Sequence, residues 1–305
     1  MDLQQIDQAI DAYSTILAAD DRQRLEFFRG LWEIQAEIAA SNAAFATNVT
    51  EAVEKLPDAN IIEGWYWQEK PVLHCAPLAI EEAQLAGNAA HIATYFTEAG
   101  GLNSTTVAAL DACNWPELVH NGSVGLAGTD PQAYLAACLS QTTQQLSKPV
   151  QTLAWMVLGA SLRPLLEGYA QAIMGLLNLK RGNQIHNKPL HCPICGSPAT
   201  AAFVGPVPSG AKNGRQLFCG VCGTAWEFER IRCGRCGTQN QSKLHYFHID
   251  GDDAHRLYLC DECGEYTRTA FTDSLRVPVS YEVEDVVMAR LDMAAQSGMH
   301  QGEGA

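Results

Sequence analysis

The sequence predicts an α+β protein: an all-α helical bundle, then two tandem β modules that each carry four cysteines, then a short C-terminal helix. Apolar residues recur at helical spacing through the first 180 residues, whereas the last third holds four Cys-x-x-Cys pairs among β-favouring segments. We expect a helical domain at 1–185, four-cysteine ribbons at 186–231 and 232–275, and a C-terminal helix and tail at 276–305.

Amphipathic spacing is clearest in residues 21–38, which place six side chains on one helical stripe: Leu25, Phe28, Leu31, Trp32, Gln35 and Ile38. Residues 79–96 and 148–179 show the same period, with Pro149 well placed in a first turn. Pro164 lies inside the last of these segments and predicts a kink or a break, because proline has no N–H to donate to the preceding turn.

Two segments interrupt the helical pattern. Residues 56–77 hold Trp65 and Trp67 between prolines, and we expect an extended loop that wraps the bundle. Residues 181–189 are polar and contain glycine and proline, which places the domain boundary there. Helical spacing returns at residues 281–295 and predicts the C-terminal helix.

The cysteine pairs form an internal repeat. Each cysteine of the first two pairs recurs 41 residues later, and in each half 23 residues separate the two pairs. An arginine stands four residues before the third cysteine of each half, Arg215 in the first and Arg256 in the second. This pattern is typical of a duplicated metal-binding ribbon. The pairs are Cys192/Cys195, Cys219/Cys222, Cys233/Cys236 and Cys260/Cys263.

Two Cys-x-x-Cys turns together supply the four thiolates that a tetrahedral metal ion accepts at about 2.3 Å. A glycine follows each pair at once, and glycine tolerates the positive φ that turns backbone amides toward the sulfurs. We expect one site to use Cys192, Cys195, Cys219 and Cys222, and the other Cys233, Cys236, Cys260 and Cys263. The spacing leaves open a second pairing, in which the first and third motifs share one ion.

Disulfide bonds are the alternative use of clustered cysteines, and they are typical of short secreted chains. This chain has 305 residues, and its start, Met1–Asp7, is acidic where a signal peptide carries positive charge. No apolar stretch approaches the ~18 residues of a membrane span. We therefore expect a cytoplasmic protein with reduced thiols and no membrane insertion.

The charge distribution argues against a nucleic-acid-binding protein. The formal net charge is −14, and residues 1–180 hold 20 acidic side chains against 8 basic ones, a net of −12. The ribbon segment 190–280 holds nine of each. A nucleic-acid binder should present a basic face instead.

As a set, the motifs resemble the formate dehydrogenase accessory protein family FdhE. The resemblance rests on Cys192-Pro193-Ile194-Cys195-Gly196, Thr224-Ala225-Trp226-Glu227, Leu244-His245-Tyr246-Phe247 and Cys260-Asp261-Glu262-Cys263-Gly264. It implies rubredoxin-like ribbons that hold two iron ions. It also implies a cytoplasmic assembly factor that binds the catalytic subunit of respiratory formate dehydrogenase before export, and not an enzyme.

Four thiolates suit iron and zinc alike, so the ligand set does not separate them. The family resemblance favours iron, and structural zinc is the alternative. Two other function classes stay open: a rubredoxin-like electron-transfer protein, and a zinc-ribbon protein that binds nucleic acid. No cofactor motif and no catalytic constellation stands out in the sequence.

The other thiols and imidazoles are weaker candidates for chemistry. Cys75, Cys113 and Cys138 lie in or beside apolar helical segments, and we expect buried thiols. We expect the histidines near the ribbons to lie around the metal sites or at the surface and not to be ligands: His191, His245, His248 and His255.

Overall fold

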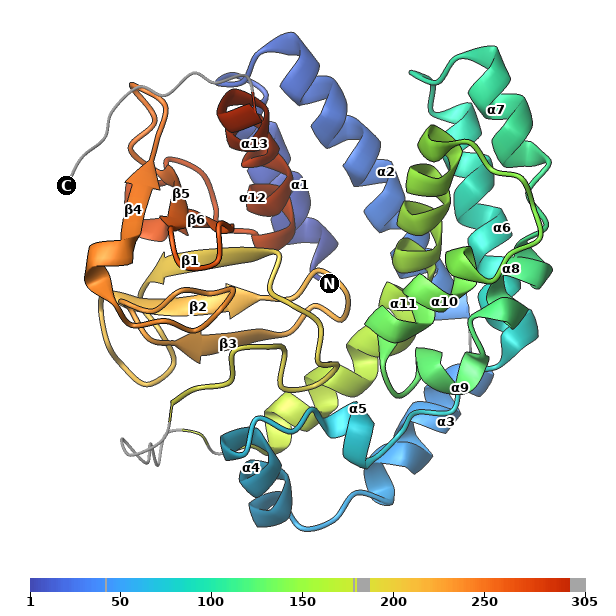
Figure 1. Cartoon of the computed structure of the whole chain (residues 1–305), viewed down its shortest axis with the longest axis horizontal. Helices are drawn as coiled ribbons and strands as arrows, with labels where there is room; N and C mark the ends of the chain where they lie inside the picture. The colour runs from blue at the N-terminus through green and yellow to red at the C-terminus, as the bar shows by residue number, and fades with distance from the viewer. Residues whose placement is uncertain (42, 178, 180–186, 297–305) are drawn as a thin grey trace.

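The α+β class expected from the sequence is confirmed (Figure 1). The computed structural model describes residues 1–41, 43–177, 179 and 187–296. Helices come first in the chain, a sheet-containing part with two four-cysteine clusters follows, and short helices end it. The tail expected at 297–305, and residues 181–186 of the expected domain boundary, lie outside the described residues.

The helical part is organised around α11 (Lys148–Leu176), because α2, α3, α6, α7 and α10 all pack against it. Its buried side chains include Leu158, Leu162, Leu166 and Tyr169, which recur at helical spacing. The other helices of this part are α1 (Leu3–Tyr13), α2 (Ala19–Ser41), α3 (Ala43–Glu54), α4 (Ala59–Trp67), α5 (Val72–Cys75), α6 (Glu82–Glu98), α7 (Ser104–Asp111), α8 (Trp115–Asn121), α9 (Val124–Ala127) and α10 (Pro131–Ser140).

The expectation of an extended loop at residues 56–77 was wrong, since α4 and α5 lie there. Asp58 caps α4 by accepting a hydrogen bond from the backbone N–H of Asn60 at 2.8 Å. Ile62 and Tyr66, four residues apart, are the buried side chains of this helix. The four-residue spacing of these two side chains is typical of a helix. The neighbouring aromatic residues and prolines favoured the expectation of a loop instead.

Pro164 does not break α11, which continues through it. A proline leaves the carbonyl four residues earlier, here that of Ala160, without its usual N–H donor. Nε2 of Gln35 on α2 donates to this carbonyl at 2.8 Å. A buried side chain of a neighbouring helix therefore replaces the missing backbone donor.

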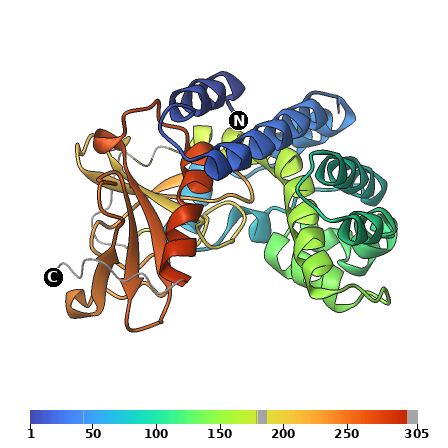
Figure 2. The ribbon, with the colours of Figure 1, turned by 90° about the horizontal axis from the view of Figure 1, so that it is seen from above.

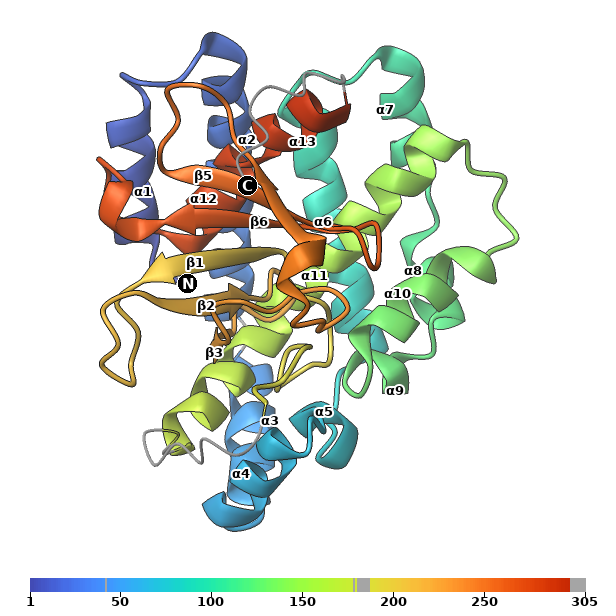
Figure 3. The same cartoon turned by 60° about the vertical axis from the view of Figure 1, so that its left-hand side comes forward.

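The sheet has six strands in the order β3-β2-β1-β6-β5-β4. Each cysteine module contributes three antiparallel strands, and the modules join where β1 runs parallel to β6, with Ala201 opposite Arg268 (Figure 3). The strands are β1 (Ala201–Gly205), β2 (Gly214–Phe218), β3 (Ala225–Phe228), β4 (Leu244–Phe247), β5 (His255–Cys260) and β6 (Tyr266–Phe271). Because β2 and β5 run in the same direction, Cys219 and Cys260 lie at the same end of the sheet.

One face of the sheet is covered by two C-terminal helices, α12 (Tyr281–Val287) and α13 (Ala289–Gln296), where one was expected (Figure 2). Met288 and Leu291 pack there against Phe203 and other strand residues. On its other side α12 packs against α1 and α2, so the two ends of the chain form a shared apolar cluster. No helix in the described ranges combines the length and the apolar character that a membrane crossing requires.

Candidate metal centres

All four Cys-x-x-Cys-Gly turns, called knuckles below, have the same backbone structure. In each, the N–H of the glycine donates to the carbonyl of the first cysteine, at 2.8 to 3.1 Å. The N–H of that cysteine donates to the carbonyl five residues later, at 2.8 to 3.0 Å. The glycines have φ between +72° and +77°, which confirms the positive φ expected after each pair: Gly196, Gly223, Gly237 and Gly264.

The knuckles bring the sulfurs together in two groups, and within each group all four sulfurs lie within 4.8 Å of one another. One group is Cys192, Cys195, Cys219 and Cys222, and the other is Cys233, Cys236, Cys260 and Cys263. The first and third motifs therefore do not share a cluster. The described cysteines form no disulfide bonds.

The sulfur spacing suits a tetrahedral ion. Four sulfurs at 2.3 Å from a central ion would lie about 3.8 Å apart. In the first cluster Cys192 lies 3.4 Å from Cys222 by sulfur–sulfur distance, and the matching pair in the second cluster, Cys233 and Cys263, is 3.9 Å apart. These donor sets fit zinc or iron without rearrangement of the backbone.

The first cluster is sealed against the helical part. All four of its cysteines have no exposed surface. The backbone N–H groups of Val72 and Leu73 on α5 donate to two carbonyls inside the first knuckle, both at 2.9 Å. Arg163 of α11 donates to the Gly220 carbonyl in the second knuckle at 3.1 Å, and its charge is balanced by Glu167 and Glu282.

The second cluster opens to solvent on one side. Cys236 is exposed and Cys263 is half-buried, whereas Cys233 and Cys260 are buried. The backbone N–H groups of Arg235 and Cys236 donate to the Cys233 sulfur at 3.3 and 3.5 Å. Solvent and reagents can therefore reach this cluster more easily than the first.

Burial raises the pKa of the Cys192 and Cys195 thiols well above the ordinary value for cysteine. Burial acts in the same direction on Cys222, but hydrogen bonds from the other three cysteines and from Thr224 outweigh it and lower the pKa of that thiol. In the second cluster, desolvation raises the pKa of Cys236 to about 12. An ion that takes four thiolates must displace the thiol protons, so its binding depends on pH.

The remaining cysteines follow the expectation only in part. Cys113 and Cys138 are buried, and burial raises the pKa of Cys138 to about 11. Cys75 is exposed at the end of α5, and the expectation of a buried thiol was wrong there. Its apolar neighbours Val72 and Leu73 face the core instead.

Sequence reasoning missed a buried charged network around His255. Its Nε2 lies 2.7 Å from Glu284 and its Nδ1 lies 2.9 Å from Asp252. Tyr13 donates to Glu284 at 2.9 Å, and Arg290 donates to Asp252 at 2.6 Å. Burial lowers the pKa of His255, but the two carboxylates outweigh it and raise the pKa to about 9. The network ties β5 to α1 and the C-terminal helices, and periodicity alone gives no signal for it.

His245 pairs with exposed Asp261 at 2.8 Å, and His191 is exposed, so both lie at the surface. His248 is half-buried, with Nδ1 3.4 Å from the Ile249 carbonyl.

Comparison with known proteins gives a sequence match at the first cluster. Residues 191–230 match the family model described as FdhE, central domain. A protein FdhE homolog from Aquifex aeolicus is 32% identical over 108 residues, which cover 35% of this chain and 37% of that protein. Protein FdhE of Escherichia coli O1:K1 is 33% identical over 85 residues, covering 27% and 26% of the two chains. These matches thus span well under half of either relative's length.

The fold extends the likeness beyond the aligned segment. The crystal structure of the FdhE protein from Pseudomonas aeruginosa superposes with a TM-score of 0.52 at 16% identity, over 98% of this chain and 90% of that one. The resemblance to the FdhE family that the cysteine motifs indicated is therefore confirmed, by sequence over the first four-cysteine module and by fold over nearly the whole chain.

Proposed function

We propose that this chain is a cytoplasmic assembly factor that binds the catalytic subunit of a respiratory formate dehydrogenase during maturation, before export. The observation that carries the proposal is the pair of four-cysteine clusters in an FdhE-like fold, the first of them inside the segment that matches the FdhE central domain. In this proposal residues 1–185 are a helical scaffold, and 186–231 and 232–275 are two metal-binding domains that it carries.

Each cluster holds one ion in this proposal, through the same eight cysteines that the repeat singles out: Cys192, Cys195, Cys219 and Cys222, and Cys233, Cys236, Cys260 and Cys263. The family resemblance favours iron, with zinc as the alternative. A bound ion supplies folding energy to its module, and iron also supplies a one-electron redox couple. The protein part holds the sulfurs in place, shields the first cluster and leaves one side of the second open.

A capture experiment tests the assembly role. The tagged chain is co-expressed with the catalytic subunit of a respiratory formate dehydrogenase, and the captured subunit is quantified. The intact chain should retain the subunit, Cys260→Ser should retain less, and Cys75→Ser serves as a matched control outside both clusters. If the metal-loaded intact chain captures none of the subunit, the assembly role is wrong.

One observation favours electron transfer as a second candidate function, namely the exposed edge of the second cluster at Cys236 and Cys263. A redox iron exchanges electrons with a partner more readily where its ligands reach the surface, and the cysteines of the first cluster have no exposed surface. Voltammetry of the iron-loaded chain would show a reversible couple, and Cys75→Ser should leave it unchanged. Iron that cannot be cycled between its ferrous and ferric states would exclude this function.

A further inference from the structure

The six-stranded sheet has a free edge at β4 (Figure 1). Within the described residues β4 is the last strand in the sheet order and pairs with β5 alone. The chain itself contacts the opposite edge strand, β3, where Lys188 pairs with Glu227 at 3.1 Å. The indole of Trp226 on that strand donates to the Pro189 carbonyl at 2.8 Å. An unpaired edge is a template for another strand, and the short β4 limits such pairing to one brief segment.

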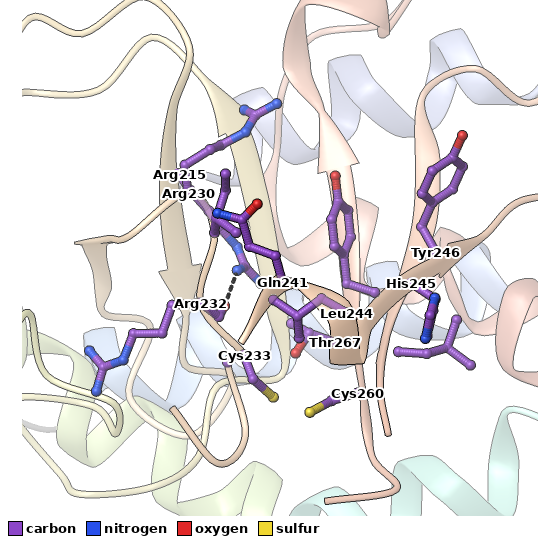
Figure 4. A pocket seen from close by; sticks show the side chains of 14 residues that line it. Arg215, Arg230, Arg232, Cys233, Gln241, Leu244, His245, Tyr246, Cys260 and Thr267 are labelled. Carbon is purple, nitrogen blue, oxygen red and sulfur yellow. Dashed lines mark hydrogen bonds between the residues drawn. The ribbon is translucent and has the colours of Figure 1, made fainter. Parts of the chain in front are cut away.

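The backbone of Tyr246 points away from the sheet. Hydrogen bonds in an antiparallel ladder alternate from residue to residue, and the N–H of Cys260 on β5 donates to Glu265, on the β6 side. Tyr258, two residues earlier, therefore also bonds to β6, and its register partner Tyr246 turns its N–H and C=O away from β5. No backbone partner for these two groups occurs within the described residues. Figure 4 shows Tyr246 on β4, apart from the Cys260 sulfur.

An arginine and three aromatic rings lie on the sheet face opposite α12 and α13, called the outer face below. Leu257 packs toward the C-terminal helices, so Tyr258 and its register partner Tyr246 face the other way. The Tyr246 ring lies 6.4 Å from that of Tyr258 and 4.9 Å from the Arg256 guanidinium. The same guanidinium lies 4.5 Å from the Phe271 ring. Contact with two rings holds the arginine in place beside the free edge.

Arg256 carries an accessible charge without an anionic partner. It is half-buried, and it makes no hydrogen bond or ion pair within the described residues. None of its nitrogens is a buried atom without a partner, so all three reach solvent. Exposed Arg230, which stacks on Phe271 at 5.7 Å, likewise pairs with no carboxylate in the described chain. Exposed Asp250 and Asp261 lie beyond the two ends of β4, so an acidic side chain fits the middle of this edge and not its ends.

We propose that the β4 edge binds an extended acidic segment of a partner polypeptide as an added antiparallel strand. A residue opposite Tyr246 forms both backbone hydrogen bonds with it and places its own side chain on the outer face. A glutamate at that position pairs with the guanidinium of Arg256.

The observations favour this occupant over two others. A single-stranded nucleic acid has no backbone N–H and C=O groups to match those of Tyr246. A second copy of this chain, paired edge to edge, would bring two Arg256 side chains onto one face, and like charges across strands are destabilising. The inference does not rest on the assembly role, because any polypeptide with such a segment fits the edge.

Three peptides test the proposal on the full chain, as purified with its metal. The first is capped Thr-Val-Thr-Glu-Thr-Val-Thr, the second has glutamine in place of glutamate, and the third carries an N-methyl group on the glutamate nitrogen. We expect the first to bind about fivefold more tightly than the second, because the ion pair is lost with the carboxylate. It should bind about tenfold or more tightly than the third, which keeps the carboxylate but cannot donate to the Tyr246 carbonyl.

Hydrogen exchange followed by nuclear magnetic resonance locates the bound strand. Saturation with the glutamate peptide should slow exchange of the Tyr246 amide about tenfold or more, because that amide gains a partner. The neighbouring Phe247 amide is a matched internal control, since it already faces Leu257 on β5 and should change little.

Two variants test the ion pair. Arg256→Gln should remove the advantage of the glutamate peptide over the glutamine peptide, so that both bind equally to this variant. Lys212→Gln changes an exposed cation on the β1–β2 hairpin and should leave that advantage intact. The comparison of the three peptides uses the unmodified chain, so it decides even where a variant melts early.

The proposal is overturned if the glutamate and glutamine peptides bind the unmodified chain equally well, or if the N-methylated peptide binds as tightly as the first. It is also overturned if an oligothymidylate binds through Arg256 while the glutamate peptide does not. Protection of the Tyr246 amide that rises with protein concentration in the absence of peptide would identify a second copy as the occupant and would overturn it as well.

Discussion

The contact between Gln35 and the Ala160 carbonyl gives a quantitative prediction about how α11 passes through Pro164. Gln35→Met keeps the volume of the side chain but removes the donor, and no backbone N–H can replace it while residue 164 is proline. A buried carbonyl that loses its partner costs about 1–3 kcal/mol. We therefore expect Gln35→Met to lower the free energy of unfolding by that amount. The contact also matters for the first cluster, since Arg163, the residue directly before Pro164, donates to the Gly220 carbonyl in the second knuckle.

A double-mutant cycle separates this explanation from a general loss of packing. In the Pro164→Ala background the N–H of residue 164 can donate to the Ala160 carbonyl, so Gln35→Met should lose most of its cost. The expected coupling between the two sites is about 1 kcal/mol or more. Urea unfolding of the four proteins, followed by helical circular dichroism, measures it. An equal cost of Gln35→Met in both backgrounds would refute the reasoning.

Three other predictions follow from the clusters and the charged network. A chelator should remove the ion of the second cluster faster than that of the first, because Cys236 is exposed; release in a single phase, followed by absorbance of the chelator complex, would contradict this. Cys192→Ala should remove one ion and loosen the first module while helical circular dichroism persists, and mass spectrometry gives the ion count; retention of both ions would be contrary to it. His255 has a pKa raised from 6.5 to about 9, so its stabilisation, of order 3 kcal/mol, is complete below pH 6.5 and is lost as the pH rises to 9. Unfolding measured across that range should show this loss in the native chain and not in His255→Gln, and an identical pH profile for both would argue against it.

The parts of the structure that depend on local sequence could be predicted. A Cys-x-x-Cys-Gly turn carries its own backbone geometry, so spacing alone indicated the knuckles and the positive φ of Gly196 and its counterparts. The unequal exposure of the two clusters could not be read from the repeat, because identical motifs acquire different surroundings: α5 and α11 cover the first, and the corresponding side of the second is open.

Hydrogen bonds between residues far apart in the sequence could not be predicted from periodicity either. Gln35 and Ala160 are 125 residues apart, and each lies in a segment that the sequence predicts to be helical. Helical spacing does not indicate which side chains of two separate helices will meet. His255 was expected near the metal or at the surface, but the alternation of β5 turns it toward Glu284 on the helix-covered face. Arg215 was visible as a repeated residue, yet only the structure shows that two of its buried nitrogens have no hydrogen-bond partner among the described residues.

Native mass spectrometry of the freshly purified, unchelated chain tests the central claim most directly. If the eight clustered cysteines hold metal, the mass should exceed that of the polypeptide by two ions less the thiol protons that they displace. A mass without metal, or one reduced by two hydrogens for each disulfide bond among these cysteines, would contradict the account.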